Sequence, residues 1–177
     1  MTNPSYDFSG AHVLVTGGTS GIGAATAAAY REAGADVTIT GTRGDADDYD
    51  ADLSSYRYLR MDIEDSESID AVAASLSTLD ILVNNAGMAL PSLGLDEYEP
   101  DVFARAVNML LIGVFRMARR SADLLAQSHI AGGPSIIGIA SMSSYFGIPI
   151  VPGYGAAKTG LVGLTRTLAV KWGERGI

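Results

Sequence analysis

The amino-acid sequence predicts an α/β protein built on a parallel β-sheet, and two observations support this fold class. Short apolar runs alternate along the chain with longer stretches of helical periodicity, which is the pattern of βαβ units with right-handed crossovers. A glycine-rich turn also joins the first apolar run to the first helical stretch. No repeat or linker interrupts residues 1–177, so we expect one domain. Strands are expected near 12–16, 35–40, 57–61, 80–84 and 135–140, and helices near 21–33, 66–77, 100–127 and 154–172.

The first strand, turn and helix predict a site for a phosphate group. The strand pattern at 12–16 leads into Gly17, Gly21 and Gly23, and an alanine-rich helix follows until Gly34. Backbone N–H groups and the positive end of the helix dipole would face an anion, and the missing side chains would let it approach. A glycine turn alone is weak evidence, but with the next strand pattern it completes a βαβ unit.

Two connections have less regular patterns. Residues 42–56 are rich in aspartate, so we expect a loop or at most a short helix there. Residues 91–100 are bounded by prolines and are expected to form a surface loop that enters the long helix.

A candidate acid–base pair opens the last helical stretch. Tyr154 and Lys158 are four residues apart and therefore lie on one helix face. A nearby ammonium stabilises a phenolate, so the phenol could act as a general acid or base. Ser141 ends an apolar run and could hydrogen-bond a carbonyl oxygen beside the phenol. Ser143 and Ser144 could border a substrate, although loop serines usually face water. The alternative is a packed ring and a solvated amine, which occur by chance in many helices.

Composition limits the partners. The formal net charge is −8, with acidic clusters at 45–52 and 62–70, which disfavours nucleic acid or an anionic membrane as a partner. Small apolar residues are abundant, as tight strand–helix layers require.

Metal, redox and membrane signals are weak. The chain has no cysteine, and His12 and His129 show no ligand spacing, so no metal site is expected and both histidines are interpreted as structural or surface residues. The first residues lack the pattern of a signal peptide, and apolar stretches such as 109–115 are too short to span a bilayer. A cytoplasmic protein is therefore expected.

Five motifs in order resemble the short-chain dehydrogenase/reductase family, in its short branch. They are TGGTSGIG at 16–23, Asn-Asn-Ala-Gly at 84–87, Asn108, Ser141, and Tyr154 with Lys158. The resemblance implies a three-layer, doubly wound, Rossmann-like parallel sheet with five visible strands in the order 3-2-1-4-5. In that family a sixth and a seventh strand follow the position of Ile177, so the resemblance also implies a chain that is incomplete at its C-terminus.

The resemblance also assigns roles to individual residues. Asn84 would brace the sheet, and Asp62 would contact the adenine ring, unless Asp62 is simply an acid that precedes a helix. Asn108, a poor helix former in mid-helix, would hold a water in a proton relay. The implied catalytic residues are Asn108, Ser141, Tyr154 and Lys158. The implied cofactor-binding residues are Gly17, Ser20, Gly21, Ile22, Gly23, Arg43, Asp62, Asn85, Ala86, Gly87, Tyr154 and Lys158.

These residues predict an NAD(P)-dependent oxidoreductase acting on an alcohol or ketone. NADP(H) is favoured over NAD(H), because no acid ends the second strand and Arg43 follows it, although Asp45, Asp47 and Asp48 crowd that arginine. A catalytically silent NAD(P)-binding sensor or scaffold, or an inactive fragment, are the alternatives. Helices 100–127 and 154–172 would pair copies into a homodimer or homotetramer. An apolar small-molecule substrate is expected from the residues around the entry, Met88, Ala89, Leu90, Met142, Tyr145 and Pro149.

Overall fold

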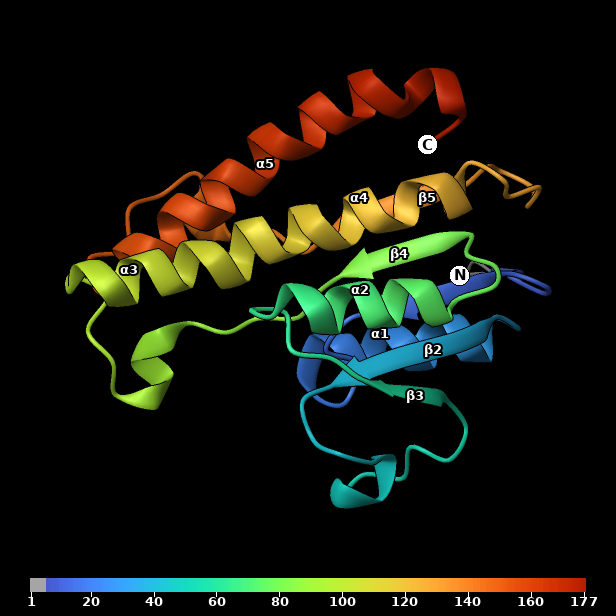
Figure 1. Cartoon of the computed structure of the whole chain (residues 1–177), viewed down its shortest axis with the longest axis horizontal. Coiled ribbons are helices and arrows are strands. Elements are labelled where there is room, and N and C mark those ends of the chain that lie inside the picture. The colour runs from blue at the N-terminus through green and yellow to red at the C-terminus, as the bar shows by residue number, and fades with distance from the viewer. Residues whose placement is uncertain (1–5) are drawn as a thin grey trace, which may run out of the picture.

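A computed structural model describes residues 6–177 and contains the predicted sheet. Its five strands are all parallel and lie in the order β3-β2-β1-β4-β5, as predicted (Figure 1). The strands are β1 His12–Val15, β2 Asp36–Gly41, β3 Arg57–Arg60, β4 Ile81–Asn84 and β5 Ser135–Gly138.

The helices connect these strands in the expected places. The α-helices are α1 Gly21–Glu32, α2 Ser66–Ser75, α3 Pro100–Val107, α4 Gly113–Leu125 and α5 Pro152–Trp172. Short 3₁₀ turns are η1 Ala46–Asp48, η2 Leu90–Leu93, η4 Met142–Ser144 and η5 Gly173–Arg175, and η3 Asn108–Ile112 is a π-helical segment. The region 42–56 is therefore a loop with one short helical turn, as predicted.

Alternating side chains along the central strands build a core on each face of the sheet. Leu14 and Leu82 pack with residues of α2, α4 and α5 on one face. Val13 and Val15 pack with Ala27 of α1 on the other face. Successive side chains of a strand point to opposite faces, so apolar residues at every position are expected when helices cover both faces of the sheet. In Figure 1, α2 and α4 lie in front of the sheet, α5 runs above α4, and α1 lies behind the sheet.

The long helix expected at 100–127 is interrupted. A π-helical segment begins at Asn108, and the Gly113 N–H donates to the Asn108 carbonyl. The change of hydrogen-bond register separates α3 from α4, and a π segment inside a helix frequently marks a functional position. Periodicity alone could not show this, because the apolar pattern continues on both sides of the segment.

The expectation of a surface loop at 91–100 is wrong in part. The segment begins within η2, and Glu97 is fully buried. A buried carboxylate requires hydrogen-bond donors, and one of them, the Tyr154 N–H, lies 57 residues away in sequence.

Within residues 6–177, no helix combines the length and apolar character that a membrane span needs.

Candidate active site

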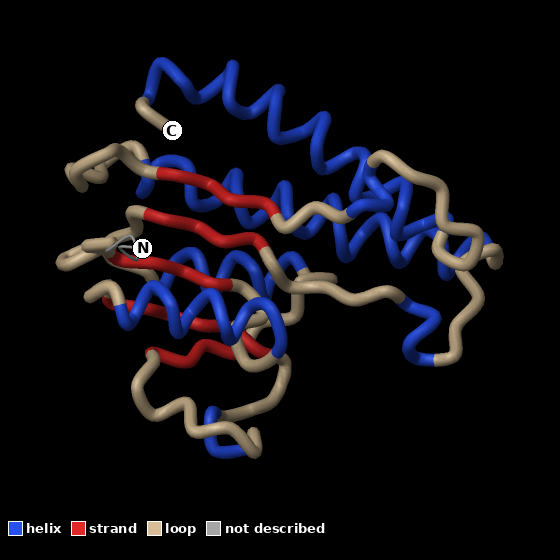
Figure 2. The backbone as a smooth tube through the Cα atoms, turned by 180° about the vertical axis from the view of Figure 1, so that it is seen from behind, coloured by secondary structure: helices blue, strands red, loops and turns tan. Residues whose placement is uncertain are grey.

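The predicted site residues gather along the edge where the strands end. In Figure 2 the segments that follow β1, β4 and β5 run toward the same side of the sheet, where α5 begins. The carboxyl edge of a parallel sheet is where doubly wound proteins bind ligands.

The glycine turn after β1 is shaped for close approach. Gly17 has a φ of +65°, and a Cβ there would lie 2.9 Å from the Ala86 Cα. Gly21 has a φ of +55° at the start of α1. The Ser20 side chain makes no capping hydrogen bond, and the first turn of α1 carries no acidic residue. No side chain therefore caps the helix N-terminus, and no first-turn carboxylate would compete with an anion.

A threonine and an asparagine hold this turn against the end of β4. The Asn85 Nδ2 donates to the carbonyls of Thr16 at 2.9 Å and Gly17 at 3.1 Å. The buried Thr16 hydroxyl accepts from the N–H groups of Asn85 and Ala86 at 2.9 and 3.0 Å. A Cβ on Gly23 would overlap the Gly17 carbonyl, so this close packing depends on glycine. Thr16 belongs to the glycine motif at 16–23, but no role of its own was predicted for it from the sequence.

The sheet brace differs from the expectation. Asn84 pairs through its backbone with Gly138, but its buried Oδ1 has no hydrogen-bond partner in the described chain. The side chains that link the ends of β4 and β1 are those of Thr16 and Asn85. Gly87 has a φ of +141° and lies against Leu110, where a side chain would clash. Ile22, at the other side of the turn, is 65% exposed.

Lys158 lies beside Tyr154 on α5, as the four-residue spacing predicts. Its Nζ is 5.7 Å from the centroid of the Tyr154 ring and donates to the Ile139 carbonyl at 2.5 Å. Only 5% of the Lys158 surface is exposed, whereas Tyr154 is half-buried. Burial lowers the pKa of the Lys158 ammonium. Lys158 is therefore enclosed by protein. This contradicts the alternative interpretation of the pair, in which the lysine amine is solvated.

The turn that carries Ser141 is docked on the same part of α5. The Ser144 hydroxyl donates to the Lys158 carbonyl at 2.9 Å, and the Thr159 hydroxyl donates to the Ser144 carbonyl at 3.2 Å. The Ser141 Oγ accepts from the Ser143 N–H at 3.2 Å, which leaves its own proton available. Ser143 and Ser144 are buried, so the expectation that such loop serines face water is wrong here.

Asn108 links the π segment to the loop after β3. Its Nδ2 donates to the Glu64 carbonyl at 3.3 Å. The Glu64 carboxylate in turn accepts two hydrogen bonds of 2.9 Å from Arg105.

Asp62 remains exposed at the end of β3, where its Oδ1 accepts from the Glu64 N–H at 2.9 Å. The N-cap of α2 is Asp65, whose side chain accepts from the Glu67 N–H. The alternative interpretation, an acid that begins the helix, therefore applies to Asp65.

Arg43 lies exposed after β2, with its side chain folded onto the neighbouring loop. The guanidinium donates to the Asp48 carbonyl and lies 4.8 Å from the centroid of the Tyr49 ring. The Tyr58 hydroxyl donates to the Arg43 carbonyl at 2.7 Å. The Tyr49 hydroxyl accepts from the Arg43 N–H at 3.0 Å, so both tyrosines hydrogen-bond the Arg43 backbone while the side chain stays exposed.

Exposed apolar side chains belong to the segments that follow β4 and β5. Leu90 was expected at this entry but is fully buried, because its apolar side chain packs into the core. The large exposed side chains here include Met88, Met142, Tyr145, Phe146, Ile148 and Ile150.

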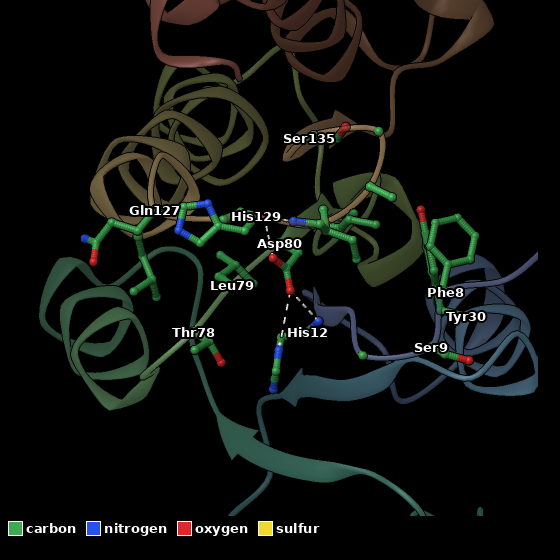
Figure 3. A pocket seen from close by; sticks show the side chains of 18 of the residues that line it. Phe8, Ser9, His12, Tyr30, Thr78, Leu79, Asp80, Gln127, His129 and Ser135 are labelled. Atoms are coloured by element: carbon green, nitrogen blue, oxygen red, sulfur yellow. Dashed lines mark hydrogen bonds and ion pairs between the residues drawn. The ribbon is translucent and has the colours of Figure 1, made fainter.

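A separate cavity of about 860 Å³ lies at the opposite, amino edge of the sheet (Figure 3). Asp80 stands in its wall, with His12 and His129 on either side. The Asp80 carboxylate accepts from the His12 N–H at 2.7 Å and from the Ser128 hydroxyl, and lies 3.4 Å from the His12 Nδ1. Burial alone would raise the pKa of Asp80, but the hydrogen bonds from Ser128 and His12 outweigh it and lower that pKa. His12 is thus part of a structural tie, as expected.

Comparison with known proteins gives consistent matches. The family profile described as short chain dehydrogenase matches residues 11–177. D-threitol dehydrogenase of Mycolicibacterium smegmatis is 35% identical, over 97% of this chain and 69% of its own length. NAD-dependent glycerol dehydrogenase of Listeria innocua is 33% identical, over 93% of this chain and 65% of its own. The solved Pseudomonas aeruginosa RhlG/NADP active-site complex matches with a TM-score of 0.84 and 28% identity, over 99% of this chain and 72% of that chain.

Proposed function

The chain belongs to the short-chain dehydrogenase/reductase family of oxidoreductases, and on that premise we propose that Tyr154 is its acid–base residue. The reaction moves a hydride between a nicotinamide and the carbon of a carbonyl or secondary alcohol. The observation that carries the assignment is the buried Lys158 beside Tyr154, with the Ser141 turn docked on the same stretch of α5. A solvated lysine would not require this enclosure.

The residues at the carboxyl edge fit a dinucleotide cofactor. The uncapped first turn of α1 would accept the pyrophosphate at the turn of Gly17, Gly21 and Gly23, with Ser20 and Ile22 beside it. Gly21 would face it with open space, whereas Gly17 and Gly23 allow the close packing that shapes the turn. Asn85, Ala86 and Gly87 would border the nicotinamide ribose, and the exposed Asp62 would meet the adenine. When bound, the cofactor supplies or accepts the hydride.

The protein residues divide the proton and oxygen chemistry. Tyr154 would give a proton to the carbonyl oxygen in reduction and remove it in oxidation. Ser141, whose hydroxyl proton is available, would donate a hydrogen bond to the same oxygen. Lys158 would favour the phenolate and hold the ribose hydroxyls, and Asn108 would hold a water in the relay to Lys158.

We propose a preference for NADP(H) over NAD(H). The end of β2 carries Gly41 and Thr42 instead of a carboxylate that would hold a ribose 2′-hydroxyl, and Arg43 offers a guanidinium at the surface. The contact with the Asp48 carbonyl has to rearrange if Arg43 is to pair with a 2′-phosphate.

We also propose a small apolar alcohol or ketone as the substrate class. The exposed methionine, tyrosine, phenylalanine and isoleucine side chains after β4 and β5 would contact it. The relatives named above are dehydrogenases of polyols, so hydroxyl groups on the substrate are compatible with the family.

The test of function mixes the purified chain with NADPH or NADH and a panel of aliphatic and aromatic ketones. Oxidation of the cofactor that depends on the ketone supports the proposed enzyme. A change of cofactor fluorescence without turnover would instead support a silent binding protein, and no binding would support an inactive fragment.

Cofactor preference is decided by dissociation constants for NADPH and NADH, measured by fluorescence titration at one ionic strength. We expect tighter NADPH binding in wild type and loss of that difference in Arg43→Ala, because the guanidinium is the proposed phosphate partner. Tighter binding of NADH by tenfold or more would contradict the preference. Arg57→Ala, on the exposed face of β3, removes a similar charge as the control.

A further inference from the structure

Glu97 is a buried carboxylate that none of the roles above uses. Glu97 has no exposed surface. Its two carboxylate oxygens accept hydrogen bonds from two backbone N–H groups that are far from each other in the chain. Oε2 accepts from the Tyr154 N–H at 2.7 Å, and Oε1 accepts from the Leu90 N–H at 3.2 Å. Within residues 6–177 Glu97 forms no ion pair, so these backbone donors are its compensation for burial.

The Tyr154 N–H that Glu97 accepts belongs to the first turn of α5. N–H groups of a first turn have no partner within their helix. The chain does not satisfy them locally, because Val151 precedes the helix without a side-chain cap and the first turn contains no acid. Glu97 therefore supplies from a distant segment both the capping acceptor and the negative charge that a helix N-terminus favours.

Tight packing fixes this contact. A Cβ on Gly153 would lie 3.2 Å from the Glu97 Oε2, 2.9 Å from the Ala106 Cβ and 3.2 Å from the Phe103 Cα. The first turn of α5 is thus pressed against α3 with the carboxylate between them. A side chain at position 153 would therefore crowd this contact.

The second oxygen of Glu97 ties this arrangement to the cofactor side of the site. Leu90 is fully buried and begins η2, a few residues after Asn85, Ala86 and Gly87. One carboxylate therefore connects the proposed nicotinamide segment with the backbone of the proposed acid–base residue.

We propose that Glu97 is a positioning residue that fixes the Tyr154 backbone, and with it the phenol, relative to the segment after β4. The proposal rests on the role proposed for Tyr154. Glu97 has no contact with the glycine turn of the cofactor site, so its effect is expected on turnover rather than on cofactor affinity.

The test variant is Glu97→Gln, which keeps the side-chain length. An amide has one acceptor oxygen, so it can keep one of the two backbone hydrogen bonds while its NH₂ group faces the other N–H. The matched control is Asp80→Asn, which makes the same chemical change at a buried carboxylate that accepts a backbone N–H at the opposite edge of the sheet.

Both variants are measured for kcat, KM, NADPH dissociation constant, unfolding midpoint and amide hydrogen exchange of residues 152–158. We expect Glu97→Gln to lower kcat by roughly 10- to 100-fold, the cost of a small misplacement of a catalytic group. KM and the NADPH dissociation constant should change little, and exchange in 152–158 should become faster. Asp80→Asn should lower the unfolding midpoint but leave kcat and that exchange close to wild type.

Two results would overturn the proposal. One is a kcat of Glu97→Gln as close to wild type as that of Asp80→Asn. The other is unchanged amide exchange in 152–158, since a Tyr154 backbone that does not depend on Glu97 is not positioned by it. If wild type turns over no substrate, the proposed function fails, and the exchange measurement alone decides the role of Glu97.

Discussion

Lys158 and Tyr154 differ in how completely the fold encloses them. The Tyr154 side chain is half-buried at the site, whereas the Lys158 ammonium is surrounded by protein with the Ile139 carbonyl as its acceptor. Enclosing a charge in this way works against stability, because burial lowers the pKa of Lys158 and disfavours the charged form. Such a cost at one residue is typical of a functional site.

The first residue-scale prediction is that Tyr154→Phe removes most of the turnover. The ring volume stays and only the hydroxyl is lost, so the fold and cofactor binding should survive. Proton transfer by a positioned side chain contributes about 10²–10⁴-fold. We therefore expect at least about a 10²-fold loss of kcat, with cofactor affinity changed by only a few-fold. Near-normal turnover between about pH 6 and 9 would show that another residue transfers the proton.

The second residue-scale prediction separates stability from function at Lys158. Lys158→Met removes the buried charge, so the unfolding midpoint of the cofactor-free protein should not fall at neutral pH. Turnover and cofactor affinity should both fall, because the ammonium is proposed to serve both.

The pH dependence provides the check for Lys158. A folded-state pKa below the unfolded value of about 10.4 means that the unfolded chain binds more protons between the two values. The free energy of unfolding of the wild type should therefore rise as the pH rises through that window, because of Lys158. Thermal unfolding of Lys158→Met should lack that gain, and an equal gain in both proteins would contradict the burial argument.

At the scale of elements, Asp80 ties three strands and a helix end together. Its backbone N–H donates to the His12 carbonyl at 2.9 Å and its carbonyl accepts from the Ser135 N–H at 3.0 Å. Its carboxylate accepts from the His12 N–H and the Ser128 hydroxyl. The amino ends of β1, β4 and β5 thus meet at one residue.

The element-scale prediction follows from the lowered pKa of Asp80. The stabilisation by its carboxylate is complete above the unfolded value of about 3.9 and is lost as the pH falls through the lower folded-state pKa. Asp80→Asn should cost about 1–3 kcal/mol of unfolding free energy at neutral pH, the penalty for a partly unsatisfied buried group. The difference between wild type and Asp80→Asn in urea unfolding should shrink below that pH window. A constant difference would mean that packing, not the carboxylate, stabilises this edge.

The sequence was most informative where the signal was local. The strands, the glycine turn and the Tyr154–Lys158 pair depend on residues within a few positions of one another, and periodicity and spacing record these. The roles of Glu97 and Thr16 depend on partners 57 and 69 residues away. Such contacts exist only after the strands have paired. The π-helical segment that begins at Asn108 could not be predicted from periodicity, because the apolar pattern continues before and after it.

At the scale of the whole molecule, the two edges of the sheet differ in what they carry. At the amino edge, the Asp80 carboxylate accepts hydrogen bonds from the His12 N–H and the Ser128 hydroxyl. The carboxyl edge leaves the α1 N-terminus uncapped, Gly17 and Gly21 without side chains and several apolar residues exposed. The contacts of Asp80 and the proposed chemistry therefore lie at opposite ends of the strands, which is why Asp80 is a suitable control for Glu97.

The packing of α5 bears on whether copies of the chain pair. Leu161 is buried, and a Cβ on Gly160 would lie 2.8 Å from the Leu111 side chain, so these positions face the rest of the same molecule. Gly163 is different, because a Cβ there would meet open space. On the neighbouring α4, Phe115 is 41% exposed, and Val170 of α5 is 84% exposed.

The whole-molecule prediction is a homodimer or homotetramer that pairs through α4 and α5. The exposed Phe115 and Val170 offer apolar surface to bury, and the open space at Gly163 would let a partner helix approach closely. Light scattering at micromolar concentration should give at least twice the mass of one chain, and Phe115→Arg should shift that mass toward the monomer by placing a charge in the contact. Ala71→Arg, on the exposed face of α2, adds the same charge elsewhere and should leave the mass unchanged. A wild-type protein that stays monomeric, or an equal effect of both arginines, would show that these helices do not form the interface.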